Sequence, residues 1–256
     1  MRYISIGDFV TDHYYKDDKL LGTNGGMTSH NIIANLANMK MNTKVFGVCG
    51  NDINGEISIK SLNDIGVDVS DCVKIENVKT RCFHVTYLEN EIKSKKRCPF
   101  CNKKEWYEES KINVENILKK IEKDDVLIFD NLNEKNREII DKTKNIKMID
   151  IGQYFELEEF TNNQILEYIN NKFKIINLNE RVENYLIKRF NFNSIIEIYN
   201  LFNPELLIVT RGKKGADFVQ KNNLITKKLD KISKEIDATG AGDAFFSVFI
   251  KNHNVY

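Results

Sequence analysis

The chain has 256 residues, enough for one large α/β domain or for a large domain with a small appendage. Its 38 Lys and Arg residues balance 37 Asp and Glu residues, so the formal net charge is +1 and bulk charge supports binding to neither nucleic acid nor a membrane surface. The sequence has no apolar run of signal-peptide or membrane-spanning length, and its five cysteines are not typical of a secreted disulfide framework. We expect a cytoplasmic protein.

Short apolar runs alternate with amphipathic stretches along most of the chain. Near-continuous apolar runs predict buried strands at 2–7, 44–50, 125–130, 146–152, 172–178 and 205–212. Apolar and polar residues at helical spacing predict helices near 28–40, 55–66, 112–122, 134–144, 162–171 and 180–202. Strand–helix alternation of this kind predicts an α/β fold, with a mostly parallel sheet and helices on both faces.

Two regions interrupt this alternation. Residues 10–23 are typical of a short polar hairpin, and residues 72–107 alternate like a strand pair that turns near Glu89 and Asn90. Together they predict a small β appendage, either a lid or an edge for dimerisation.

The segment DATGAGDAFF, residues 237–246, places two glycines and an aspartate just before an apolar run. Gly240 and Gly242 allow backbone N–H groups to approach an anion closely, and a helix that begins here would direct its positive end at that anion. Asp243, in the first turn of such a helix, would accept a proton from a hydroxyl group. Phosphoryl transfer needs held phosphates, neutralised charge and a positioned acceptor hydroxyl, so this segment suits it.

The same segment resembles the signature of the ribokinase (PfkB) family of sugar and nucleoside kinases. Other matches follow in family order: Gly7-Asp8 after the first strand, NGGMTSHNIIANLANM at 24–39, VFGVCGNDINGE at 45–56, INLNE at 176–180 and VTRGKKG at 209–215. Each match is weak alone, but together they are specific. The resemblance implies a single ribokinase-like domain over 1–256, a three-layer α/β/α sandwich whose small β lid is formed by about 10–23 and 72–107.

The resemblance also implies ATP and Mg²⁺ as cofactors and assigns residues to the transfer reaction. Asp243 is expected to deprotonate the acceptor hydroxyl, beside an anion hole formed with Gly240, Ala241 and Gly242. The residues expected against ATP are Thr210, Arg211, Gly212 and Gly215. Those expected to help place Mg²⁺, through water, are Asn177 and Glu180.

The acceptor is expected to be a sugar or a sugar-derived metabolite. The residues that the resemblance places at its hydroxyl groups are Asp8, Gly25, Gly26 and Asn31. At KMIDIGQYF, residues 147–155, the family commonly has D-x-N and a nearby Arg, whereas Asp150 is followed here by Gly152 and Gln153. This departure argues against ordinary phosphosugar or fructose-type recognition, and a nucleoside acceptor is the alternative.

Family members continue beyond the point where this chain stops, at Tyr256, with elements that wall the adenine pocket. The sequence is therefore expected to be either truncated or partial, or a natural short variant. A non-catalytic sugar-binding or regulatory protein is accordingly a second alternative to a kinase. A homodimer through the lid is an expectation from the family.

Cysteine and histidine residues in the second irregular region suggest a structural zinc site. Cys98 and Cys101 form a C-x-x-C pair, and Cys82 and His84 would point to the same face of a strand. A turn near Glu89 would bring Cys98 opposite Cys82, which completes a Cys₃His set. Free thiols, a redox disulfide, and a zinc-dependent module that docks a partner remain alternatives.

Overall fold

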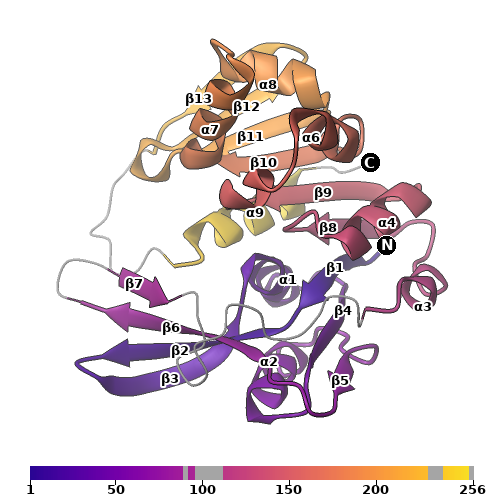
Figure 1. Cartoon of the computed structure of the whole chain (residues 1–256), viewed down its shortest axis with the longest axis vertical. Helices are drawn as coiled ribbons and strands as arrows, with labels where there is room; N and C mark the ends of the chain where they lie inside the picture. The colour runs from indigo at the N-terminus through magenta and orange to yellow at the C-terminus, as the bar shows by residue number, and fades with distance from the viewer. Residues whose placement is uncertain (89–91, 96–111, 230–238, 254–256) are drawn as a thin grey trace. The chain divides into compact units, whose positions relative to one another are not determined.

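The structure, a computed structural model, describes residues 1–88, 92–95, 112–229 and 239–253 (Figure 1). The chain divides into two compact units. Unit 1 comprises Met1 and Ile121–Phe246, and unit 2 comprises Arg2–Lys120 and Ser247–Tyr256. The predicted α/β fold, with mostly parallel strands, helices and a second small sheet, is confirmed.

The described part of unit 1 has strands in the spatial order β13-β12-β11-β10-β9-β8. These strands are β8 (Val126–Phe129), β9 (Ile146–Ile151), β10 (Ile175–Asn179), β11 (Leu206–Thr210), β12 (Ala216–Gln220) and β13 (Asn223–Lys227). Strands β8 to β11 pair in parallel, whereas β12 and β13 are antiparallel. Parallel strands covered on both faces need apolar residues throughout, and VLIF of β8 is buried at every position.

The helices of unit 1 follow its strands along the chain. They are α4 (Glu134–Lys142), α5 (Phe155–Glu158), α6 (Asn162–Ile169), α7 (Glu180–Phe190), α8 (Ile195–Phe202) and a turn of 3₁₀ helix, η2 (Gly212–Lys214). Helices α7 and α8 lie beside strands β10 to β12 (Figure 1).

The helix predicted over 180–202 is two helices, α7 and α8. Asn191 ends α7 in the left-handed conformation, with a φ of 55°. Ser194 then begins α8 through a capping box with Glu197. Local capping chemistry therefore interrupts a continuous apolar periodicity.

The β12–β13 hairpin was not predicted. Its turn is made by Lys221 and Asn222, both with positive φ, as two-residue hairpin turns require. Strand β13 is exposed along its whole length and forms the edge of the sheet, with Leu224 and Ile225 47% and 53% exposed. A strand without a buried face carries no alternation that sequence analysis could detect.

Unit 2 combines a parallel sheet with the small sheet. The parallel strands lie in the order β1-β4-β5 and are β1 (Tyr3–Asp8), β4 (Thr43–Gly50) and β5 (Val73–Ile75). The small sheet has the order β3-β2-β6-β7 and contains β2 (Val10–Lys16), β3 (Lys19–Gly26), β6 (Arg81–Tyr87) and β7 (Ile92–Lys95). The helices are α1 (Thr28–Asn38), α2 (Ile53–Asn63) and α3 (Val114–Leu118). The small sheet falls on the two irregular regions of the sequence.

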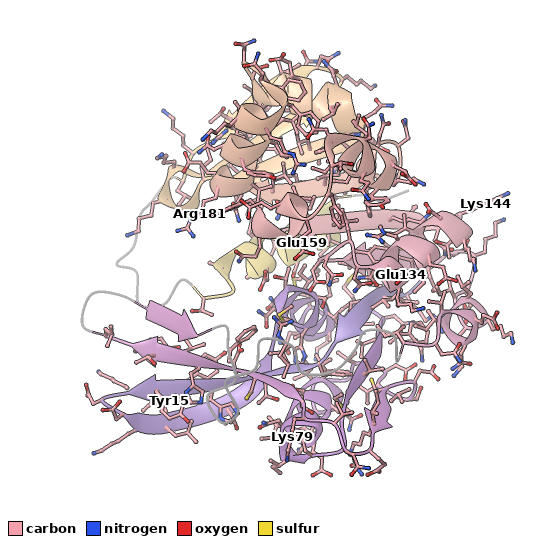
Figure 2. All side chains as sticks on the ribbon, in the orientation of Figure 1. Tyr15, Lys79, Glu134, Lys144, Glu159 and Arg181 are labelled. Carbon is pink, nitrogen blue, oxygen red and sulfur yellow. The ribbon has the colours of Figure 1, made fainter. Side chains whose placement is uncertain are left out.

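Helix α9 (Ala241–Asn252) is divided between the two units. Across the described residues, every helix is too short or too polar to cross a membrane. Figure 2 shows the side chains on the ribbon, with Tyr15 on β2 and Arg181 at the start of α7 among those labelled.

Candidate functional site

A row of polar side chains lies at the carboxyl ends of three neighbouring strands of unit 1. Asp150 on β9 is level with Asn177 on β10 in the strand register. Phe129 is level with Ile149, so Asp130, the next residue, is level with Asp150. All three polar side chains are buried. The carboxyl ends of parallel strands are where α/β proteins bind ligands, so this row marks a candidate site.

Charge and burial act together on Asp150. Burial, followed by the nearby charges of Asp243 and Asp130, raises the pKa of this carboxyl group to about 8, although a hydrogen bond with Asn177 acts to lower it. Among the described residues, the Oδ1 atom of Asn177 has no hydrogen-bond partner. The row therefore offers one acceptor oxygen to a ligand, beside a carboxyl group that retains its proton.

The predicted catalytic loop leads directly into α9. Gly240 has a φ of 73°, which lets the chain turn sharply, and its carbonyl oxygen accepts the first helical hydrogen bond from Ala244 N, at 2.9 Å. Asp243 lies in the first turn of the helix and is close enough to Asp150 for their charges to interact. The first turn of a helix has free N–H groups, so this loop presents donors and a carboxylate together.

The predicted nucleotide segment forms the turn between β11 and β12. Thr210 Oγ1 donates to the carbonyl oxygen of Leu178, at 3.3 Å. Gly215 has a φ of 102°, and a Cβ atom there would lie 1.9 Å from the carbonyl oxygen of Lys227. Gly212 also has a positive φ, of 54°, but no atom lies within 4 Å of its Cβ position. The turn therefore requires glycine at 215 for both conformation and space.

Arg211 in this turn is anchored by carboxylates. Its Nη1 and Nη2 atoms donate to the two oxygens of Glu183, at 2.7 and 2.8 Å, and Nε donates to Asp217 Oδ2, at 2.5 Å. The hydrogen bond with Glu183 is the largest of the effects that raise the pKa of Arg211 above its ordinary value. These contacts use three of the five donors of the guanidinium group, so the side chain has a strong structural role.

The two residues predicted to place Mg²⁺ have different surroundings. Asn177 is buried in the polar row, whereas Glu180 is half-buried, with its Oε1 atom 3.1 Å from Lys214 Nζ and 3.7 Å from Arg211 Nη1. Sequence analysis missed Asn179 between them. Its Oδ1 caps α7 by accepting from two backbone N–H groups, and its Nδ2 donates to the carbonyl oxygen of Gly152, at 2.7 Å.

The predicted acceptor residues Gly25 and Gly26 end β3 in unit 2, just before α1. A Cβ atom on Gly26 would lie 2.3 Å from Asp12 Oδ2, so the buried carboxylate of Asp12 rests against this glycine. Asn31 lies in the first turns of α1. Asp8 ends β1, and its side chain is not described. Asp12 was missed because only the fold brings its strand beside the glycine pair.

Aromatic side chains share the face of the small sheet that carries Asp12. Tyr14 lies two residues further along β2, and its hydroxyl group is 3.4 Å from Asp12 Oδ2. The rings of Tyr14 and Tyr87 stack with centroids 6.2 Å apart and an interplanar angle of 18°. A carboxylate beside stacked rings offers both hydrogen bonds and a flat apolar surface to a ligand.

The predicted zinc site is only partly within the described residues. Cys82 is buried on β6, and the ring of His84 on the same strand packs against Tyr15, with centroids 4.5 Å apart. Cys98 and Cys101 lie outside the residues that the structure describes. No metal-binding cluster of His, Cys, Asp or Glu occurs within 1–88, 92–95, 112–229 and 239–253, so zinc stays a prediction.

Comparisons with known proteins extend over nearly the whole chain. A family model described as pfkB family carbohydrate kinase matches residues 14–253. A search of the curated proteins finds no significant match.

Similar solved structures include a nucleoside kinase of Burkholderia thailandensis in complex with inosine, with a TM-score of 0.75 and 16% identity over 97% of this chain and 82% of that one. A fructokinase double mutant of Vibrio cholerae O395, with fructose, ADP and potassium bound, has a TM-score of 0.73 and 21% identity over 97% and 82%. An uncharacterized sugar kinase of Pyrococcus horikoshii, in complex with ATP, has a TM-score of 0.73 and 18% identity over 97% and 83%. At these identities the likeness shows a common fold.

Proposed function

The chain belongs to the pfkB family of carbohydrate kinases, phosphotransferases that act on an alcohol group, and we propose that it transfers the γ-phosphoryl group of ATP to a hydroxyl group of a sugar or sugar-derived metabolite. The observation that carries this proposal is the position of Asp243 in the first turn of α9, directly after the left-handed Gly240. The carboxylate is the general base for the acceptor hydroxyl, and the N–H groups of the turn stabilise charge on the transferred phosphoryl group.

The nucleotide is assigned to the segment around η2 in unit 1, with Thr210, Gly212 and Gly215 against ATP. The glycines keep the turn compact, while Arg211 fixes it to α7 and β12 through Glu183 and Asp217. Arg211 thus contributes mainly by holding the turn in shape.

The polar row suits a magnesium ion. Mg²⁺ prefers oxygen ligands and keeps much of its water, and the row supplies the Oδ1 atom of Asn177, which has no hydrogen-bond partner in the described part of the chain. Asn177 and Glu180 would hold the ion through water. When bound, such an ion neutralises charge on the phosphates.

The acceptor is assigned to unit 2. Asp12 and Asn31 supply a carboxylate and an amide for hydroxyl groups, and the buried Gly26 lets the Asp12 carboxylate lie against the backbone, with Asp8 and Gly25 beside them. We assign the small sheet the role of a lid on this binding surface, because Asp12 and Tyr14 both lie on it.

A nucleoside acceptor is the second candidate. The stacked pair of Tyr14 and Tyr87 favours it, because a base can stack on tyrosine whereas a free sugar uses mainly hydrogen bonds. The similar nucleoside kinase of Burkholderia thailandensis is compatible with this candidate.

The proposal is tested by acceptor-dependent release of ADP from Mg-ATP. The panel contains ketoses, aldoses, amino sugars and nucleosides. Turnover with one acceptor should fall by about 100-fold or more in Asp243→Asn, because a general base is lost. Asp18→Asn, in the exposed turn between β2 and β3, is the matched control and should retain full activity.

Two other outcomes would contradict parts of this proposal. An acceptor that binds by calorimetry without any turnover would contradict the kinase and favour a binding protein. Full activity in Asp243→Asn would remove the assigned base. Tyr87→Ala should raise KM about tenfold for a nucleoside and leave KM for a sugar unchanged, which separates the two acceptor classes.

A further inference from the structure

A small cavity with both polar and apolar lining lies in unit 2 beside the residues assigned to the acceptor. It has about 10 Å³ of space that the centre of a water molecule can occupy, and it is lined by Ser5, Gly7, Phe9, Ser29, His30 and Val45. Ser5 and Gly7 share one face of β1, Val45 is level with Ser5 on β4, and His30 comes from the first turn of α1. A cavity of this size holds a single water molecule.

The hydrogen bonds around His30 determine which of its ring nitrogens carries the proton. Ser61 Oγ donates its only proton to the carbonyl oxygen of Ser58, at 2.8 Å. We therefore assign the ring proton to His30 Nε2, which is 3.1 Å from Ser61 Oγ and donates to it. Burial lowers the pKa of His30 to about 4, so the ring is neutral at pH 7 and its Nδ1 atom is an acceptor.

Two polar atoms at the cavity need a hydrogen-bond partner. Considering the residues that the structure describes, neither His30 Nδ1 nor Ser5 Oγ makes a hydrogen bond. The two residues are only 5% and 1% exposed. Buried polar groups are normally paired with protein or with ordered water, and a water molecule that donates to Nδ1 and also bonds Ser5 Oγ would satisfy both.

We propose that this cavity binds one internal water molecule, which bridges His30 Nδ1 and Ser5 Oγ and makes His30 a positioning residue for Gly25 and Gly26. The ring lies so close to Gly25 that a Cβ atom there would be 2.0 Å from His30 Cε1. Phe9 packs edge-on against the same ring, with centroids 6.2 Å apart at 86°. The water fixes the second nitrogen as Ser61 fixes the first, and the fixed ring supports the glycine backbone.

The water bridge is tested without any assay of activity. A high-resolution crystal structure should show one ordered water within hydrogen-bond distance of both His30 Nδ1 and Ser5 Oγ. Nitrogen chemical shifts of the imidazole should show the neutral form protonated at Nε2. A dry cavity, or a proton at Nδ1, would overturn the proposal.

The positioning role is tested by amide hydrogen exchange at Gly25, Gly26 and Met27. Exchange should be about tenfold faster in His30→Phe and in the milder variant Ser5→Ala, because the water bridge that fixes the ring is lost in both. In His30→Gln part of the protection against exchange should remain. Thr43→Val is the matched control, since Thr43 Oγ1 is also buried and unpaired within the described part of the chain but does not line the cavity. Equal exchange in all variants would overturn the role.

The kinetic readout rests on the proposed function. With an acceptor found, His30→Phe should raise its KM about tenfold and change kcat and the KM of ATP by less than about twofold, with partial rescue in His30→Gln. A fall in kcat alone would contradict the positioning role. If no acceptor is turned over, the proposed function fails separately, and the exchange experiment still decides the role of His30.

Discussion

Burial of His30 as a neutral ring makes stability depend on pH. Its pKa is about 4 in the folded protein and 6.5 ordinarily, so between these values the unfolded chain binds a proton that the folded chain does not. Stability is therefore full above pH 6.5 and falls as the pH drops to 4, by about 3 kcal/mol in total from this residue.

Urea unfolding at pH 7 and pH 4.5 checks this prediction. The loss of stability between the two pH values should be smaller in His30→Gln than in the parent protein by about 2–3 kcal/mol, because glutamine does not titrate. His253→Gln, just after α9, is the control for removal of a histidine elsewhere in the chain. Identical losses in the parent and in His30→Gln would contradict the prediction.

Gly215 and Gly212 form a matched pair of glycines in one turn. Alanine at 215 would be strained at a φ of 102° and would clash with the carbonyl oxygen of Lys227, whereas alanine at 212 meets only the cost of a positive φ. We expect losses of about 3 kcal/mol or more for Gly215→Ala and about 1 kcal/mol for Gly212→Ala. Thermal unfolding without nucleotide measures both, and equal losses would disprove the clash.

At the scale of elements, Arg211 joins α7, β12 and the turn between β11 and β12. The side chains of its carboxylate partners Glu183 and Asp217 are only 6% and 9% exposed. A replacement that removes the planar guanidinium group therefore lowers the free energy of unfolding, because it leaves buried carboxylates without their partner. Asp217 also accepts a hydrogen bond from Thr226 on β13, at 2.6 Å. The network therefore ties four neighbouring segments of unit 1 together.

Arg211→Lys should lower the free energy of unfolding by about 2 kcal/mol, since an ammonium group cannot bond both carboxylates in the same geometry. Lys214→Gln is the control, because the Lys214–Glu180 pair is exposed and should contribute less than about 0.5 kcal/mol. Denaturant titration in the absence of ATP measures both variants. Equal effects would show that the buried network is no stronger than a surface pair.

Elements with a near-continuous apolar run or a clear helical periodicity were predictable from the sequence, whereas the β12–β13 hairpin was not. The strand expected at 44–50 is β4, Thr43–Gly50, and the helix expected at 134–144 is α4, Glu134–Lys142. Strand β13 is exposed and gave no apolar signal, and β12, although mostly buried, is interrupted by the buried Asp217 and lacks a near-continuous apolar run. The break at Asn191 depends on a single residue in the left-handed conformation, which apolar periodicity does not reveal.

At the scale of the whole molecule, the candidate site was predictable where its residues stand in local motifs. Gly240 directly precedes a helix that carries Asp243 in its first turn, as expected. The positions of Asp12 and Asp130 in the candidate site depend instead on strand pairing. Asp12 lies against Gly26, and Asp130 is level with Asp150 on β9, only once the strands have paired. The exact register of the β2–β3 hairpin and the pairing of β8 with β9 are not written in a local motif, and these two residues belong to none.

The exposed edge strand β13 has a practical consequence for work with the protein in solution. Among the strands that the structure describes, none pairs with its outer edge, where Leu224 and Ile225 are exposed, and a net charge of +1 with an isoelectric point near 7.6 supplies little repulsion between molecules. We expect concentration-dependent association near neutral pH. Ile225→Lys should reduce it with little change in melting temperature, and light scattering across a dilution series measures the difference. If scattering is the same in both proteins, pairing at the edge of β13 does not cause the association. Storage at a pH well away from 7.6, where the molecules carry a larger net charge and repel one another, would then be the way to limit it.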